Sequence, residues 1–274
     1  AILQALSTIP SFCCQQLSDS GPILPLARAL SINLSLLKKR STPIDPSNFL
    51  RALQSLISKN RQTAFNINTQ QDAQEILQIL IDELKEASVL ADDALSASLV
   101  NTTSCEYCNS FNIIETKQDI IQLPLTKSVA SSIGFFLSSE YLRDANRWFC
   151  SLCNSLQDSV RITSFANTGN VLIFQILRFA NFEGRVIKDN RKFNILSEAI
   201  TIPIKTDETV TLRKTYKLRA SINHSGTLKD GHYWAFIKEE TSNSWLKCND
   251  SSVIKVKFSD LSNDSSYILV YSVY

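Results

Sequence analysis

Two short cysteine motifs constrain this chain more than any other feature of its sequence. The same C-x-x-C spacing occurs twice, in "CEYC" (Cys105, Cys108) and in "CSLC" (Cys150, Cys153). Both thiolates of such a turn can reach one ion, and two turns complete a tetrahedral Cys₄ zinc site. A redox dithiol or a chance pairing is the alternative, but two identical spacings among seven cysteines favour structural zinc. Because 41 residues separate the pairs, we expect the metal to join two distant hairpins at the tip of a larger element rather than to form a small DNA-reading finger.

The composition is that of a globular domain. The 274 residues are 44% hydrophobic and 20% charged, which suits one large domain with a substantial core. Apolar runs fall far short of the roughly 20 residues that cross a bilayer, and no signal peptide is visible. With a net charge of +2 and no long basic run, we expect neither a membrane nor a nucleic acid as partner. Seven cysteines used for metal or catalysis rather than disulfides fit an intracellular protein, cytoplasmic or nuclear.

Hydrophobic periodicity divides the chain into two unlike halves. Up to about residue 90 it is helical, and "QDAQEILQILIDELKEA" (71–87) shows one amphipathic helix with apolar residues at i, i+3, i+4 and i+7. From about residue 100 the pattern predicts strands over 110–125, 158–165, 171–179, 216–223, 232–240, 251–258 and 267–274, with a helix near 135–145. We therefore expect one α+β domain with a helical lobe, a β lobe and a zinc-tipped insertion.

The two histidines bracket a glycine-containing loop, in "HSGTLKDGHYWAF". His232 follows Gly231 at the predicted junction of loop and strand, where an imidazole can face a cleft. A partly buried histidine bonded to backbone is an equally good interpretation of that residue alone. About one hairpin later, "SWLKCNDSSV" places Asn249 and Asp250 where they could lie beside His232. A carboxamide or carboxylate there would orient the imidazole as in a nucleophilic triad, although "ND" also favours a plain turn.

Taken together, the motifs resemble those of the ubiquitin-specific proteases. "AILQAL", "QQDAQEIL", the two cysteine pairs, "VLIFQILRF", "HSGTLKDGHYWAF", "WLKCNDSSV" and "YILVY" occur in the family's order from Ala1 to Tyr271. The resemblance implies a papain-like cysteine protease fold with a helical thumb (about 1–95), zinc-tipped β fingers (about 96–170) and a β-rich palm (about 171–274). It also implies hydrolysis of the isopeptide bond after the C-terminal glycine of ubiquitin, with ubiquitin and ubiquitinated proteins as partners.

The resemblance also assigns roles to residues of the active site. His232 in "GHY" matches the general base, Asn249 the orienting third member, and Asp250 a neighbouring polar residue on which some relatives also depend. The family's nucleophilic cysteine would lie four residues before Ala1, and the oxyanion-hole asparagine would also precede this chain. Since the sequence contains no methionine, we interpret it as a fragment, and without the nucleophile we expect it to be inactive by itself.

Four further residues match positions that contact the ubiquitin tail in relatives. Asp72 and Glu75 in "QDAQE" lie at i, i+3 on a helix N-terminus, where two carboxylates suit a cationic peptide. An acidic first turn that caps the helix is the structural alternative, and both can hold. His224 opens the loop that moves over the tail in relatives, and Tyr233 would line the narrow diglycine channel.

The remaining cysteines are expected to be packing residues. Cys13 and Cys14 lie beyond Pro10, past the end of the first helix, and Cys248 precedes Asn249. A catalytically inactive ubiquitin-binding scaffold is the second hypothesis, and a zinc-stabilised module unrelated to ubiquitin is a weaker third. The retention of His232 and Asn249 favours the enzyme.

Overall fold

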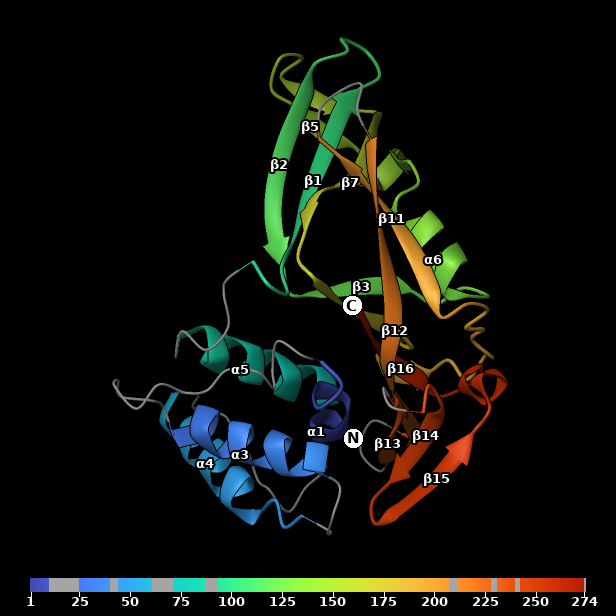
Figure 1. The fold of residues 1–274 in the computed structure, drawn as a ribbon. Helices are drawn as coiled ribbons and strands as arrows, with labels where there is room; N and C mark the ends of the chain where they lie inside the picture. The colour runs from blue at the N-terminus through green and yellow to red at the C-terminus, as the bar shows by residue number, and fades with distance from the viewer. Residues whose placement is uncertain are drawn as a thin grey trace.

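A computed structural model describes residues 1–9, 25–39, 44–60, 71–86, 93–206, 211–227, 231–239 and 242–273. The helices of the first part gather at one end of the molecule, and the strands of the second part form its remainder (Figure 1). The helices of the first part are α1 (Ile2–Leu6), α3 (Pro25–Lys39), α4 (Ser47–Asn60) and α5 (Ala73–Glu86). The prediction of a mixed α+β fold is therefore confirmed.

Helix α5 has the amphipathic character that its sequence predicts. Its buried side chains include Leu77, Leu80, Ile81 and Leu84, which recur at helical spacing on one face. They pack in a core cluster with α1, α3, α4 and strands of the β region. Burial of this face, rather than intrinsic propensity, holds a helix of 14 residues in place.

A 12-stranded sheet forms the rest of the framework, in the order β15-β14-β13-β12-β11-β7-β1-β2. Strand β16 pairs with β12 and β8, β3 pairs with β8, and β4 pairs with β7. The strands of this sheet are β1 (Ala97–Cys105), β2 (Phe111–Gln118), β3 (Ile120–Pro124), β4 (Glu140–Leu142), β7 (Ser159–Thr168), β8 (Val171–Leu177), β11 (Ala199–Lys205), β12 (Thr211–Gly226), β13 (Gly231–Lys238), β14 (Trp245–Asn249), β15 (Ser252–Val256) and β16 (Ser266–Ser272).

Two separate hairpins complete the described strands. They are β5 (Trp148–Cys150) with β6 (Ser155–Gln157), and β9 (Phe179–Phe182) with β10 (Arg185–Lys188). Strands β1, β2 and β7 extend away from the helices and carry β5 at their far end (Figure 1). The second cysteine pair therefore lies at the tip of a long β element, as the sequence predicts.

The central strands are buried on both faces, between two cores. In β8, Val171 and Ile173 belong to the core shared with the helices, whereas Leu172, Phe174 and Ile176 belong to a second core that includes helix α6 (Val129–Phe136). Strand β16 divides its side chains between the same two cores. This arrangement explains the nearly continuous apolar runs of both strands.

Two predictions of local structure are wrong. The helix expected near 135–145 is α6, which begins earlier because Ser128 and Ser131 form a capping box. Within 135–145, β4 pairs with β7, and a short 3₁₀ turn, η1, covers Asp144–Asn146. The strand expected over 110–125 is two strands, because the chain bends at Asp119. Before the bend β2 pairs with β1, and after it β3 pairs with β8.

A short 3₁₀ helix, η2 (Phe258–Leu261), precedes β16.

In the described residues, no helix is both long and apolar enough to cross a membrane.

Candidate functional site

The hairpins β12–β13 and β14–β15 bring His232 and Asn249 together. His232 is the second residue of β13, paired with Ser225 of β12, and Asn249 ends β14, the other neighbour of β13. The Nε2 atom of His232 lies 2.5 Å from Oδ1 of Asn249. The expected proximity of these two residues is therefore present, although they are 17 positions apart in sequence.

This contact fixes the tautomer of the imidazole. The amide oxygen of Asn249 can only accept, so Nε2 of His232 carries the proton and donates it. The other ring nitrogen, Nδ1, is then the basic atom. The side chain of His232 is 46% exposed, so the imidazole is open in part to solvent. An oriented, accessible imidazole of this kind can take a proton from a thiol.

Asp250 adds a negative charge beside the same ring. Its Oδ2 atom lies 3.9 Å from Nε2 of His232, and its side chain is 81% exposed. Asp250 begins the tight turn between β14 and β15 with φ of 50°, a left-handed conformation that aspartate tolerates. The "ND" pair thus serves both as a turn and as a polar flank of His232, so the two interpretations hold together.

A large cavity adjoins this site. It has a volume of about 960 Å³ and lies between the helices and strands β13 to β15. Ala1 at the start of α1, Tyr233 and Asp250 all line it, together with apolar side chains of α3 and α4. The N-terminal end of α1 therefore shares one cavity with the residues around His232.

Asp72 has two structural roles at the start of α5. Its Oδ1 atom accepts hydrogen bonds from the backbone nitrogens of Gln74 at 2.7 Å and Glu75 at 3.2 Å, as an N-cap residue does. Its Oδ2 atom accepts a hydrogen bond from the hydroxyl of Tyr267 at 2.7 Å. Glu75 lies in the first turn and is exposed. The capping interpretation of the acidic pair is thus correct for Asp72, and it leaves Glu75 open to solvent.

His224 and Tyr233 are direct neighbours on β12 and β13. Their ring centroids are 4.5 Å apart, and the hydroxyl of Tyr233 accepts a hydrogen bond of 3.4 Å from the backbone nitrogen of Ala73. Burial, assisted by the charge of Lys188, lowers the pKa of His224 to about 4, whereas Asp72 acts in the opposite direction. His224 is therefore neutral near pH 7. With Phe179, Tyr233 and Tyr267 it forms a group of contacting rings, the aromatic wall, which faces the start of α5.

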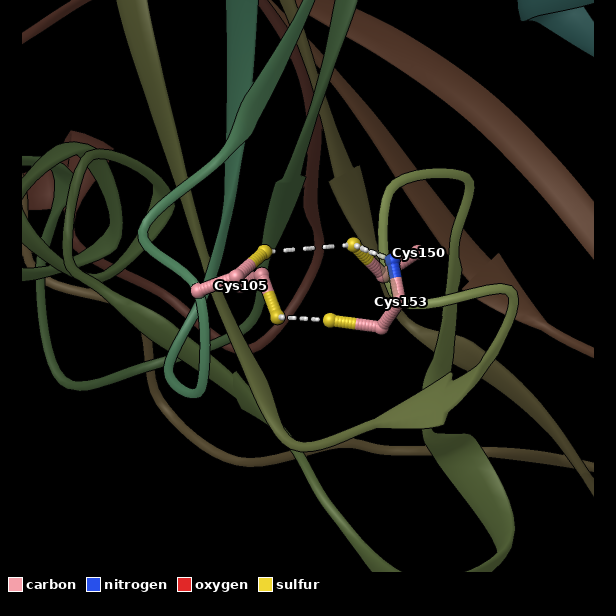
Figure 2. A group of neighbouring side chains, drawn as sticks. Cys105, Cys150 and Cys153 are labelled. Atoms are coloured by element: carbon pink, nitrogen blue, oxygen red, sulfur yellow. Dashed lines mark hydrogen bonds between the residues drawn. The ribbon is translucent and has the colours of Figure 1, made fainter.

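The four paired cysteines converge on one point. Their Sγ atoms all lie within 4.8 Å of one another, with 4.0 Å between Cys105 and Cys153 and 3.6 Å between Cys108 and Cys150. Figure 2 shows the labelled cysteines of the two knuckles turned toward each other. Tetrahedral bonds of about 2.3 Å to one zinc ion require sulfur separations of about 3.8 Å. The donor set and spacing therefore fit one zinc ion.

The knuckles share further features that suit a metal. Asn109 and Asn154 follow the second cysteine of each pair, and both have a left-handed backbone, with φ of 57° and 52°. The Ser110 hydroxyl lies 3.2 Å from Sγ of Cys150 and is the main cause that lowers the pKa of that thiol to about 6. A hydrogen bond with Cys108 is the main cause that raises the pKa of Cys153 to about 12, followed by burial. Because cysteine binds zinc as the thiolate, a bound zinc ion would displace that proton.

Of the three remaining cysteines, Cys248 is the one that lies within the described residues. Cys248 is 3% exposed and packs in the core shared with the helices, as expected for a packing residue. Cys13 and Cys14 lie outside the described residues. Among the described residues, the side chain of His232 contacts Asn249 and Asp250 and stacks on the ring of Trp234.

Sequence reasoning gave no individual role to several polar residues of this region. Tyr267 joins Asp72 to Gln175, and Arg178 donates from a fully buried position to the carbonyl oxygens of Ser266, Asp189 and Arg191. The available signal was a glutamine and an arginine within the otherwise apolar "VLIFQILRF", since a polar side chain in a buried strand needs a specific partner.

Comparison with known proteins agrees with this architecture. The ubiquitin carboxyl-terminal hydrolase family profile matches residues 1–271, so the chain belongs to that family. Relatives include ubiquitin carboxyl-terminal hydrolase 8 of Saccharomyces cerevisiae, 27% identical over 82% of this chain and 57% of the relative. Ubiquitin carboxyl-terminal hydrolase 25 of Arabidopsis thaliana is 24% identical over 90% of this chain and 38% of the relative. The chain thus spans about half or less of these relatives.

A solved structure shares the fold over nearly the whole chain. It is described as the "SAGA Ubp8/Sgf11/Sus1/Sgf73 DUB module bound to ubiquitin aldehyde", and the similarity covers 99% of this chain and 66% of the other chain. The TM-score is 0.78 at 23% sequence identity. The expected fold class is confirmed by this likeness.

Proposed function

We propose that the protein is a cysteine-type deubiquitinase that hydrolyses the bond after the C-terminal glycine of ubiquitin. The observation that carries the proposal is the oriented His232–Asn249 pair in a chain of this family. A solved structure of the same fold is bound to ubiquitin aldehyde, which supports ubiquitin as the partner. Ubiquitinated proteins are the corresponding substrates, and we propose an intracellular location.

In this mechanism Nδ1 of His232 takes the proton of the nucleophilic thiol, while Asn249 holds the ring and Asp250 lies beside it. The thiolate attacks the last carbonyl of ubiquitin, and His232 returns the proton to the leaving amine. Water then hydrolyses the thioester. From the family resemblance we expect the thiol four residues before Ala1, and the position of Ala1 in the cavity that Asp250 also lines supports this expectation.

The same proposal assigns the remaining parts. About 1–95 form the thumb, about 96–170 the fingers and about 171–274 the palm. Zinc bound by the four clustered cysteines would hold the two finger knuckles together, a structural rather than a chemical contribution. Asp72, Glu75, His224 and Tyr233 would line the path of the ubiquitin tail.

The test uses the natural protein with the segment that precedes Ala1, treated with ubiquitin that carries an electrophilic C-terminus. We expect covalent labelling at a cysteine before Ala1, labelling that slows by about 100-fold or more in His232→Ala, and normal labelling in the control Cys248→Ser. Binding of ubiquitin without labelling would instead support the second hypothesis, a non-catalytic ubiquitin-binding scaffold. Failure to bind ubiquitin at all would refute both.

A further inference from the structure

One carboxylate connects the helical region to the β region beside the candidate site. Asp72 caps α5 through Oδ1 and accepts the Tyr267 hydroxyl through Oδ2, across 195 positions of sequence. In Figure 1, α5 lies among the helices at lower left, and β16 lies in the β region to its right. The start of α5 is therefore anchored to β16 by a hydrogen bond to a charged group, which is stronger than a neutral one.

The Tyr267 hydroxyl also accepts a hydrogen bond, from one member of a pair of glutamines on its other side. Nε2 of Gln122 donates to Oε1 of Gln175 at 3.1 Å, and Nε2 of Gln175 donates to Oη of Tyr267 at 2.8 Å. The two glutamines are paired residues of the parallel strands β3 and β8. Because Oη already accepts from Gln175, its single proton is available for Asp72. The three hydrogen bonds thus run in one direction and end at the Asp72 carboxylate. In such a chain each hydrogen bond strengthens the next.

Tyr267 also belongs to the aromatic wall that faces α5. Its ring centroid lies 6.1 Å from Phe179, 6.3 Å from His224 and 6.2 Å from Tyr233. Tyr267 is 2% exposed. Burial, followed by the nearby Asp72 charge, raises the pKa of its hydroxyl above the usual value, so it keeps the proton that it donates. The neighbouring rings therefore hold the Tyr267 ring in place, with its hydroxyl directed at Asp72.

We propose that Tyr267 is a positioning residue for the tail of ubiquitin, acting through Asp72. The hydrogen bond from Tyr267 occupies one acceptor site of Oδ2, and the capping bonds occupy Oδ1. The acceptor capacity that remains on Oδ2 then has a fixed direction for a cationic group of the tail. Gln175 supports this alignment from the palm side. The proposal rests on the proposed function, since it names ubiquitin as the ligand.

The experiment compares Tyr267→Phe with Tyr271→Phe, a matched control on the same strand. Tyr271 is fully buried, and its hydroxyl has no hydrogen-bond partner among the described residues. Both variants remove one buried oxygen, but only Tyr267→Phe removes a hydrogen bond to Asp72. Binding to intact ubiquitin and to ubiquitin without its C-terminal tail is measured by calorimetry, and amide exchange is followed in the first turn of α5.

We expect Tyr267→Phe to weaken binding of intact ubiquitin by about tenfold, as for loss of a hydrogen bond to a charged group. Binding of tail-less ubiquitin should not change, and the amides of Gln74 and Glu75 should exchange faster. Tyr271→Phe should change neither. The effect of Tyr267→Phe on binding should disappear in an Asp72→Ala background.

Equal losses with intact and tail-less ubiquitin would overturn the proposal, since they indicate general destabilisation. So would equal effects of the two tyrosine variants. If the unmodified protein binds no ubiquitin, the proposed function fails and the role in positioning the tail fails with it. The exchange rates then still report whether Tyr267 anchors α5, which distinguishes the two failures.

Discussion

The titration of His224 offers the sharpest test of how the candidate site is packed. His224 is 2% exposed, and its ring contacts those of Tyr233 and Phe179. Its backbone oxygen accepts a hydrogen bond of 2.6 Å from Nζ of Lys188. Burial is the larger cause and the charge of Lys188 the smaller, and together they lower the pKa from 6.5 to about 4, against the opposing effect of Asp72.

The size and sign of the effect on stability follow from that shift. A shift from 6.5 to about 4 corresponds to about 3 kcal/mol, at roughly 1.4 kcal/mol per pH unit. Between these two pH values the unfolded chain binds a proton that the folded chain does not, so stability falls as the pH falls through this window. The loss begins near pH 6.5 and is complete below about pH 4.

The assay is an NMR titration of the imidazole resonances. The chain contains only two histidines, and His224→Gln assigns the signals. We expect the titration midpoint of His224 near pH 4 in the wild type. In Lys188→Met the midpoint should rise by only part of the difference from 6.5, because the Lys188 charge is a smaller cause than burial. In urea, wild type should lose about 3 kcal/mol relative to His224→Phe between pH 6.5 and pH 4. A midpoint within about half a unit of the ordinary value would refute the reasoning.

Three other predictions concern catalysis, metal and packing. Asn249→Ala should lower kcat of the natural protein by about 100-fold with a small change in KM, and an unchanged kcat in steady-state assays would contradict the proposed orienting role. Metal analysis should find one zinc per chain, and strong chelation should increase amide exchange around Cys105 and Cys150; exchange unchanged on chelation would argue against structural zinc. Gly169→Ala should destabilise the protein by about 2 kcal/mol in urea unfolding, because its Cβ would lie 2.4 Å from the Ala94 carbonyl oxygen. The control Gly134→Ala meets no atom within 4 Å in α6, so equal destabilisation by both variants would contradict this explanation.

Several features of the fold could be predicted because they depend on local pattern. Helix α5 follows from apolar residues at helical spacing, and β8 from a continuous apolar run. The cluster of four cysteines follows from two identical C-x-x-C turns, each of which is a local geometry. The helix expected near 135–145 could not be placed correctly, because the capping box at Ser128 and the pairing of β4 with β7 decided its limits.

The candidate site divides in the same way. Its residue types and order suggested a histidine with an amide partner, and the hairpin spacing was sufficient to expect His232 beside Asn249. Only the tertiary structure joined Asp72 to Tyr267, because nothing in the local sequence of either residue specifies a partner 195 positions away. The same holds for the lowered pKa of His224, which depends on burial and on Lys188 from another hairpin. The sequence by itself determined which chemical groups are present and the local turns that present them, whereas packing of the helices against the sheet decided which groups meet and how strongly each holds its proton.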